Sequence, residues 1–170
     1  MIEPRIDALT GVSCRRDANN RLADEFRIAR QLAMPLSVCL IDINRFKQVN
    51  DTCGHARGDD ARRQVARLLA LGLRSDDYLA RFGGEEFIVM LPNTRAELAR
   101  QIAERLKRAV EEGPWFAPAR LTVSIGLATS EPQCTLIGEL IEAADTALYQ
   151  ARNLCRNRVE SATPAADAAA

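Results

Sequence analysis

Apolar residues recur along this chain in two spacings, one typical of amphipathic helices and one typical of buried strands. Steps of three and four residues predict helices over residues 15–33, 59–73, 95–112 and 136–152. Nearly continuous apolar runs at 36–43 and 121–128 predict strands that are buried on both faces. Two shorter runs, 78–82 and 86–91, flank Gly83 and Gly84, and this pattern predicts a hairpin whose two turn residues take positive φ.

The order of these elements predicts the fold class. A short helix should begin at Arg45, because Asn44 is a favoured N-cap residue. The strands and the helices between them then follow the β-α-β-β-α-β plan of ferredoxin-like cores. We therefore expect an α+β fold in which one mainly antiparallel sheet is surrounded by helices, with most of the helices on one face. Residues 15–160 would form the domain, 1–14 a lead-in, and the alanine-rich 161–170 a disordered tail.

Composition narrows the function classes. The 170 residues fit one domain, and 23 basic and 23 acidic side chains leave no net charge to attract nucleic acid. No apolar run approaches the ~18 residues that span a bilayer, and no signal peptide opens the sequence. The five cysteines are widely spaced without a C-x-x-C pair, which favours reduced thiols. We expect a cytoplasmic protein that contacts neither nucleic acid nor membrane.

Carboxylates at two strand ends are the first candidates for chemistry. Asp42 lies at the end of an otherwise apolar strand, and Glu85-Glu86 begins the second strand of the hairpin. A buried carboxylate costs several kcal/mol unless it is paired or bound to a metal. If the strands are neighbours, Asp42 and one glutamate can share a hard divalent cation such as Mg²⁺, since adjacent strand residues point to opposite faces. The alternative is that Asp42 caps a turn and the glutamates are a solvated hairpin edge.

Three neighbouring features favour a phosphate-bearing ligand. Gly83 and Gly84 carry no Cβ, so a ligand can approach their backbone closely. The helix expected from Arg45 offers free N–H groups and a positive dipole end beside Asp42. Lys47 in its first turn adds a mobile positive charge. A metal site, a phosphate cradle and a lysine together indicate a nucleoside triphosphate site.

The sequence resembles the GGDEF-domain family, the diguanylate cyclases, in seven motifs. The signature is Arg-Phe-Gly-Gly-Glu-Glu-Phe at residues 81–87. The other motifs lie at residues 7–11, 41–47, 50–59, 122–126, 143–149 and 156–159. Because all seven occur in the family's order, the resemblance covers about residues 7–159 and is far more specific than any single motif.

The resemblance implies a nucleotidyl-cyclase-like core that condenses two GTP into cyclic di-GMP and releases pyrophosphate. Each subunit of a homodimer would hold one GTP, and an upstream sensory region usually controls the family. Mg²⁺, or Mn²⁺ in its place, would be held by Asp42, the Ile43 carbonyl and Glu85, with Glu86 assisting. Glu85 is the family's usual candidate for the general base, although the choice between Glu85 and Glu86 stays open. Lys47 would offset charge on the phosphates.

The resemblance also implies a set of substrate contacts. The residues concerned are Phe46, Lys47, Asn50, His55, Asp59, Gly83, Gly84, Arg152 and Arg156. Asn50 and Asp59 would bind guanine, and the two arginines would reach the triphosphate. Taken singly, Asn50 and Asp59 could instead cap helices, the arginines could complement a helix dipole, and His55 could be a structural loop residue.

A second site is implied by Arg74 and Asp77, an R-x-x-D pattern six residues before the Gly-Gly pair. In the family this pattern marks an inhibitory site for the product, and Arg105 could supply a further arginine. Taken alone, the R-x-x-D pattern is common and would indicate only a charged loop. A rival function is therefore a catalytically weak receptor for cyclic di-GMP.

Two departures from the family pattern bear on activity. Asn44 replaces the usual second aspartate, which would not matter if this residue is an N-cap. Cys155 replaces a glycine before Arg156, at a position where left-handed backbone geometry would strain any other residue.

Overall fold

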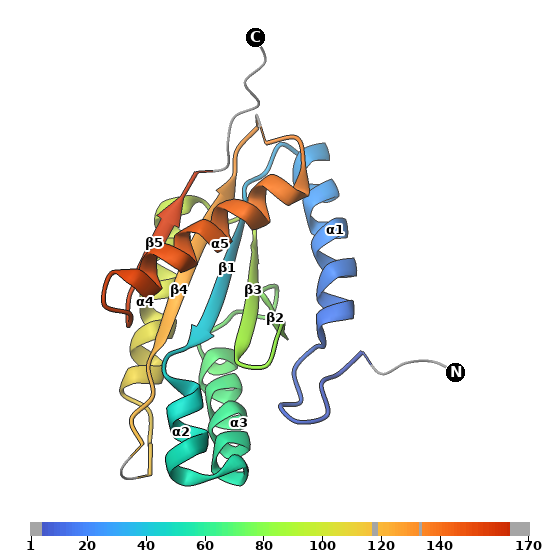
Figure 1. Ribbon diagram of the computed structural model, residues 1–170. Coiled ribbons are helices and arrows are strands. Elements are labelled where there is room, and N and C mark those ends of the chain that lie inside the picture. Colours follow the sequence, from blue (N-terminus) through green and yellow to red (C-terminus); the bar gives the residue numbers. More distant parts are fainter. Residues whose placement is uncertain (1–4, 117–118, 133, 164–170) are drawn as a thin grey trace.

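Five strands form a single sheet in the order β2-β3-β1-β4-β5 in a computed structural model that describes residues 5–116, 119–132 and 134–163 (Figure 1). The strands are β1 (Leu36–Ile43), β2 (Tyr78–Arg81), β3 (Glu86–Pro92), β4 (Val123–Ser130) and β5 (Val159–Ala162). The helices are α1 (Arg15–Gln31), α2 (Phe46–Cys53), α3 (His55–Leu71), α4 (Ala96–Glu111) and α5 (Ile137–Asn153). β1 pairs antiparallel with β3 and β4, β2 pairs antiparallel with β3, and β5 joins β4 in parallel. The α+β class and the β-α-β-β-α-β plan are confirmed.

Helices cover both faces of this sheet, so the expectation that they lie mainly on one face is wrong. Along β1, Cys39, Ile41 and Ile43 belong to one apolar cluster, which α3 and α4 complete. Val38 and Leu40 belong to a second cluster, which α1 and α5 complete. Every residue of β1 is buried. The nearly continuous apolar run of residues 36–43 already indicated a layer on each side.

The helices α2 and α3 lie at the end of the sheet where β1 ends (Figure 1). α3 begins at His55, four residues earlier than expected, because Gly54 at φ 83° closes α2 and lets the next helix begin at once. Asp59 therefore lies inside α3 and Asn50 lies inside α2. Neither residue caps a helix, which removes the structural alternative for both.

The hairpin turn differs from the two-glycine turn that the sequence indicated. Among the described glycines, positive φ occurs at Gly11 and Gly54 and not at Gly83 or Gly84. The turn is longer, and it closes through hydrogen bonds from the Phe82 and Gly83 N–H groups to the Glu86 carbonyl at 2.8 and 3.2 Å. A Cβ on Gly83 would approach the Glu86 carboxylate, whereas a Cβ on Gly84 would meet nothing within 4 Å.

The strand β5 was not predicted. It extends to Ala162, two residues past the expected domain boundary, so Ser161 and Ala162 are not part of a tail. Four residues are too few to display a strand period, and the parallel partner β4 supplies the pairing instead. The rest of the expected tail, residues 164–170, lies outside the described residues.

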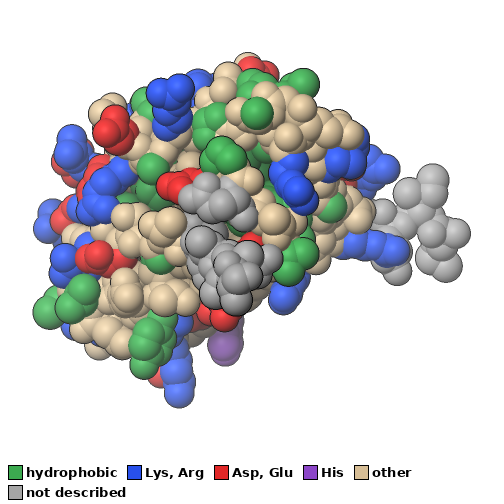
Figure 2. Space-filling model, turned by 90° about the horizontal axis from the view of Figure 1, so that it is seen from above, with side chains coloured by type: hydrophobic (Ala, Val, Ile, Leu, Met, Phe, Trp, Pro, Cys, Tyr) green, Lys and Arg blue, Asp and Glu red, His purple; other side chains and the backbone are tan. Residues whose placement is uncertain are grey.

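Charged side chains of both signs are interspersed on the surface that Figure 2 shows. This agrees with the balanced composition of the chain. In the part of the chain that the structure describes, no helix combines the length and apolar character needed to cross a bilayer.

The loop after α5 has an unfavourable backbone conformation. Cys155, Arg156 and Asn157 are consecutive and have φ angles of 73°, 62° and 46°. A non-glycine residue in this region costs about 1–2 kcal/mol. The expectation that Cys155 occupies left-handed geometry is confirmed.

Replacing Cys155 with glycine should relieve part of this strain. The substitution removes the Cβ clash but adds about 0.5–1 kcal/mol of unfolded-state entropy, so we expect a net stabilisation of about 0.5–1 kcal/mol. Urea unfolding of the purified chain measures it. Cys155→Ser keeps the Cβ and should show no gain, and equal midpoints for the glycine and serine variants would contradict the assignment of strain.

Candidate active site

The Asp42 carboxylate lies at the end of β1, in the middle of the sheet. The strand register sets Asp42 directly opposite Glu86 on β3 and opposite Ser124 on β4. Opposed residues share a sheet face, so Glu86 is the glutamate on the face of Asp42. Glu85 lies in the turn just before β3, where its carbonyl accepts a 3.0 Å hydrogen bond from the Ile43 N–H. The three carboxylates therefore gather at one end of the sheet.

Asp42 is buried, and only one of its two carboxylate oxygens has a partner that offsets its negative charge. The residue is 4% exposed. Its Oδ2 lies 3.2 Å from Arg152 Nη1, while Oδ1 is buried and has no hydrogen-bond partner among the described residues. Burial raises the pKa of Asp42 to about 6; Arg152 opposes this rise, and the charges of Glu85 and Glu86 add to it. A further cation would stabilise the ionised carboxylate.

These residues fit a hard divalent cation. The orphaned Asp42 Oδ1, the Ile43 carbonyl and the carboxylate of Glu85 are all oxygen donors, the type that Mg²⁺ prefers. Within the described ranges, no three Asp, Glu, His or Cys side chains are already arranged to hold a metal ion. The glutamate side chains, which are partly exposed, would therefore have to turn toward Asp42.

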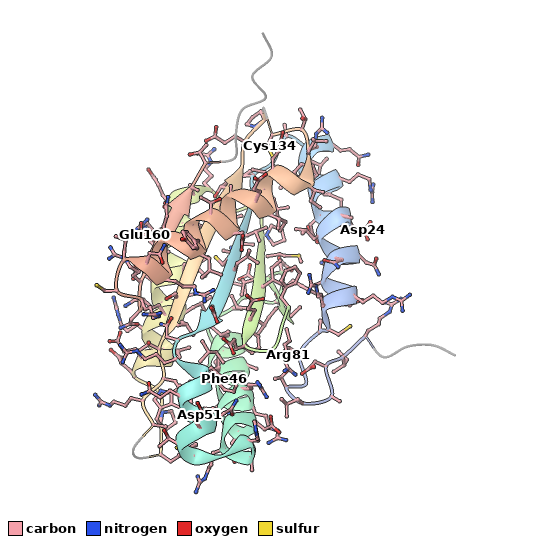
Figure 3. All side chains as sticks on the ribbon, viewed as in Figure 1. Asp24, Phe46, Asp51, Arg81, Cys134 and Glu160 are labelled. Carbon is pink, nitrogen blue, oxygen red and sulfur yellow. The ribbon has the colours of Figure 1, made fainter. Side chains whose placement is uncertain are left out.

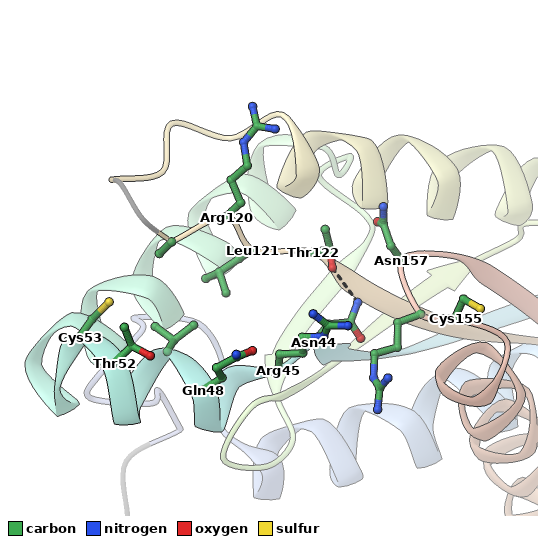
Figure 4. A pocket seen from close by; sticks show the side chains of 13 residues that line it. Asn44, Arg45, Gln48, Thr52, Cys53, Arg120, Leu121, Thr122, Cys155 and Asn157 are labelled. Atoms are coloured by element: carbon green, nitrogen blue, oxygen red, sulfur yellow. Dashed lines mark hydrogen bonds between the residues drawn. The ribbon is translucent and has the colours of Figure 1, made fainter.

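Asn44 fixes the junction between β1 and α2 and is not the N-cap that we expected. Its side chain donates to Thr122 Oγ1 at 2.9 Å and accepts from Ser124 Oγ at 2.7 Å, and the residue is 7% exposed (Figure 4). Arg45 occupies the N-cap position in left-handed geometry at φ 55°, without a side-chain cap. Both atoms of the Asn44 amide are thus used to anchor this junction to β4.

The first turn of α2 follows directly from this junction. Phe46 is buried under the helix, while Lys47 is exposed and its side chain makes no ion pair or hydrogen bond with any residue that the structure describes. The uncapped N–H groups of this turn and the lysine form a positively charged surface next to Asp42. Arg156, in the loop after α5, lies close enough to Asp42 for its charge to lower the pKa of that carboxyl.

A cavity of about 500 Å³ lies beside this turn, between α2, residues 119–122 and the loop 155–157 (Figure 4). Arg45, Arg120 and Arg156 are the charged residues of its lining. Asp42, Glu85 and Glu86 do not line it. The cavity therefore adjoins the expected phosphate site without containing the carboxylates.

Asn50 on α2 lies against Gly58 on α3, the residue before Asp59, and we call the surroundings of Asn50 and Asp59 the base subsite. A Cβ on Gly58 would collide with the Asn50 amide oxygen, so glycine is needed for the two helices to approach here. Asp59 Oδ1 accepts a 2.7 Å bond from Arg62 Nη1. His55 is exposed in the first turn of α3.

Arg81 connects the N-terminal segment to the hairpin turn. The Arg81 guanidinium bonds the Asp7 carboxylate at 3.1 and 3.3 Å, and it also donates to the Gly83 and Gly84 carbonyls at 3.1 and 3.0 Å. Figure 3 shows Arg81 at the end of the hairpin, toward the N-terminal segment. The turn that carries Glu85 is thus held by a residue from the expected lead-in.

The R-x-x-D residues bond each other. Arg74 contacts Asp77 through its backbone N–H, Nε and Nη2 at 2.9, 3.3 and 3.0 Å, and the Asp77 side chain is fully buried. Arg74 Nη2 also donates to Thr94 Oγ1 at 2.9 Å. Arg105 donates to the Gly72 carbonyl at 2.6 Å, which places it next to this turn. The structure therefore brings together the three residues of the expected inhibitory site.

Sequence reasoning missed four contacts at these sites. Arg152 was assigned to the triphosphate, yet it pairs with Asp42. Arg62, Thr94 and Asp7 had no assigned role, although each holds a candidate site residue. The i,i+3 spacing of Asp59 and Arg62 in a helix was the one available signal.

Comparison with known proteins decides the family. The chain matches the family described as "Diguanylate cyclase, GGDEF domain" over residues 5–158. This protein belongs to the GGDEF family. Diguanylate cyclase A of Treponema denticola is 42% identical over 127 residues, which make up 73% of this chain and 34% of that protein. Diguanylate cyclase DgcP of Pseudomonas aeruginosa is 39% identical over 160 residues, 92% of this chain and 24% of that protein.

A solved GGDEF domain has the same fold. The GGDEF domain of DgcB from Caulobacter crescentus, determined in complex with c-di-GMP, superposes with a TM-score of 0.89. The two are 28% identical, and the match covers 95% of this chain and 97% of that one. The match thus spans 34% and 24% of the two curated relatives but nearly all of the solved domain.

The raised pKa of Asp42 predicts that Asp42→Asn stabilises the metal-free domain at neutral pH. The folded-state pKa of about 6 exceeds the unfolded value of about 4, so the folded state loses stability as pH rises from 4 through 6. The amide removes this penalty and should add about 1–3 kcal/mol at pH 8 and almost nothing at pH 4. Urea unfolding in buffer with a chelator measures the difference. The exposed Asp145→Asn is the control, and parallel pH profiles for Asp42→Asn and wild type would contradict the prediction.

Proposed function

We propose that this GGDEF domain is a diguanylate cyclase, which condenses two GTP into cyclic di-GMP and releases two pyrophosphates. The observation that carries the proposal is the unpaired, buried oxygen of Asp42, with Glu86 opposite it and Glu85 on the adjoining turn. These three carboxylates together suit a divalent cation next to the first turn of α2, where a triphosphate can bind. The relatives named diguanylate cyclases support the same activity.

Different residues of the chain bind the base and the phosphates of GTP. Asn50 and Asp59 hold the guanine base in the base subsite. The backbone of the first α2 turn, Lys47 and Arg156 hold the phosphates. Gly84 leaves open space beside the turn, into which a phosphate can approach the backbone.

Catalysis in this proposal depends on the carboxylates. Mg²⁺ or Mn²⁺, held by Asp42, the Ile43 carbonyl and Glu85, would supply Lewis-acid stabilisation of the charge that develops on the α-phosphate. Glu85 accepts the proton of the attacking 3′-hydroxyl, with Glu86 as the other candidate. The guanidinium of Arg152 is half exposed, so it could turn from Asp42 to the phosphates if that carboxylate had another partner.

Turnover in this proposal needs two subunits. Each subunit presents one GTP, and the hydroxyl of each substrate attacks the other, so the reaction proceeds only when two sites face each other. The reaction would take place in the cytoplasm, which supplies GTP and keeps the free thiols reduced. The amount of turnover per subunit should rise with protein concentration.

Glu85→Gln tests the proposal. The amide keeps the shape of the side chain but removes a charge from the cation site, so cyclic di-GMP formation should fall at least about 100-fold. The purified chain is incubated with GTP and MgCl₂ over a range of protein concentrations, and the products are separated by chromatography. Glu97→Gln, in the exposed first turn of α4, should keep the wild-type rate.

Two results would contradict different parts of this proposal. A Glu85→Gln variant as active as wild type would refute the metal and base assignment. A wild-type chain that forms no cyclic di-GMP at any concentration, even when fused to a dimerising segment, would refute the activity itself.

Inhibition by the product is the second part of the proposal. Arg74 is half exposed, and its planar guanidinium can pair with a phosphate or a guanine edge while Asp77 keeps it in place. Arg105 lies beside the same turn. The DgcB domain, solved with c-di-GMP, supports binding of this dinucleotide by the fold.

Arg74→Ala should weaken binding of cyclic di-GMP at least tenfold, a loss of ~1.4 kcal/mol or more. Calorimetry with cyclic di-GMP compares the affinity of the variant with that of wild type. Because product inhibition is relieved, the rate of cyclic di-GMP formation should slow later in the variant as product accumulates. Arg67→Ala, an exposed arginine on α3, is the matched control. Equal affinities of wild type and Arg74→Ala for cyclic di-GMP would show that the R-x-x-D residues form only a charged loop. Tight product binding without any GTP turnover would favour the receptor function.

A further inference from the structure

Two buried polar atoms at the base subsite have no hydrogen-bond partner among the residues that the structure describes. They are Asn50 Oδ1, an acceptor on α2, and Arg62 Nε, a donor on α3. Buried polar atoms are nearly always hydrogen-bonded, and an orphaned one calls for a water, an ion or a ligand. A pair of opposite hydrogen-bonding character at one place points to a ligand that offers both a donor and an acceptor.

A chain of contacts shows that the two atoms belong to one cluster. A Cβ on Gly58 would touch Asn50 and would lie 3.2 Å from Phe46 Cζ. Arg62 Cζ in turn lies 4.4 Å from the centroid of the Phe46 ring. Phe46 thus lies close to both side chains, and its ring packs against the arginine.

The Arg62 side chain is held in one orientation. Its Nη1 donates to Asp59 Oδ1 at 2.7 Å, the Phe46 ring supports its guanidinium, and the side chain is 19% exposed. A guanidinium presents its donors in a rigid planar fork, so fixing Nη1 also fixes the direction of Nε–H. The Asp59 side chain, at 41% exposed, still has an accessible oxygen.

We propose that Arg62 determines base specificity by donating its Nε–H to the O6 carbonyl of guanine. This rests on the proposed binding of guanine by Asn50 and Asp59. The Watson–Crick edge of guanine carries an acceptor, O6, beside two donors, the N1–H and the N2 amino group. Asp59 accepts from the donors, and Arg62 serves the neighbouring acceptor. Adenine has an amino group in place of O6, so it would set a donor against a donor.

Nucleoside diphosphates test this assignment without turnover, since they carry no pyrophosphate leaving group. 6-Thio-GDP keeps the N1–H and the amino group but replaces O6 with sulfur, a weak acceptor. Calorimetry with MgCl₂ should give wild-type protein about tenfold higher affinity for GDP than for 6-thio-GDP. In Arg62→Met, which keeps the apolar stem over Phe46, the two affinities should agree within about twofold.

Two further variants separate recognition from packing. Arg62→Lys can still pair with Asp59 but has no donor at the Nε position, so it too should lose the preference for GDP over 6-thio-GDP. Arg63→Met is the matched control, because Arg63 makes the same i,i+3 pair with Asp60 at 2.9 Å and is half exposed. The control should keep the tenfold preference.

The outcomes distinguish this inference from the function on which it rests. IDP, which lacks the amino group, and ADP report on the base subsite as a whole. If wild type prefers GDP over IDP and ADP, but the ratio of GDP to 6-thio-GDP is near one or is unchanged in Arg62→Met, the role of Arg62 is refuted while the guanine subsite stands. If wild type shows no preference for GDP over ADP, both fail.

Discussion

The buried carboxylate of Asp42 is the constraint on which the arrangement of this domain depends. An ionised group at the end of an apolar strand loses its hydration, and Arg152 compensates only one of its two oxygens. The positive N-terminal end of α2, Arg152 near the end of α5 and Arg156 in the following loop all lie close to Asp42. Glu85 and Glu86 add negative charge at the same place and raise the pKa of Asp42 further. One oxygen of Asp42 thus stays unpaired while two further carboxylates lie close by, and a divalent cation can complete the site.

The sheet gives this charge a fixed position. β1 is the central strand, paired in register with β3 on one side and β4 on the other. Glu86 and Ser124 are therefore set opposite Asp42 by backbone pairing, and Ser124 in turn fixes Asn44, from which α2 departs. A shift of one residue in this register would move Asp42 to the other face, where α3 and α4 pack an apolar core. Packing on both faces of β1 consequently protects the geometry of the site.

Long elements and their order could be predicted from the sequence, because their periods extend over many residues. The run 36–43 is β1 to the residue, and the stripe of residues 95–112 is α4 within one residue at each end. The junctions could not be predicted. Asn44 has the side chain of an N-cap, but tertiary bonds to Thr122 and Ser124 determine its role, and Arg45 takes the cap position. Likewise Arg152 has the sequence position of a phosphate ligand, and its pairing with Asp42 arises from the packing of α5 on the sheet. Contacts between distant segments leave no periodic signal in a single sequence.

The N-terminal segment, expected to be a lead-in, takes part in the site through one ion pair. Arg81 has its own N–H bonded to the Ser13 carbonyl and its guanidinium bonded to Asp7 and to the glycine carbonyls of the turn. Burial raises the pKa of Asp7, but hydrogen bonds from Thr10 and the proximity of Arg81 outweigh this effect and lower the pKa below its ordinary value. Asp7 therefore stays ionised at neutral pH, and Arg81 keeps its partner. Since the same guanidinium holds the carbonyls just before Glu85, any displacement of residues 5–14 must either move the turn or break this pair.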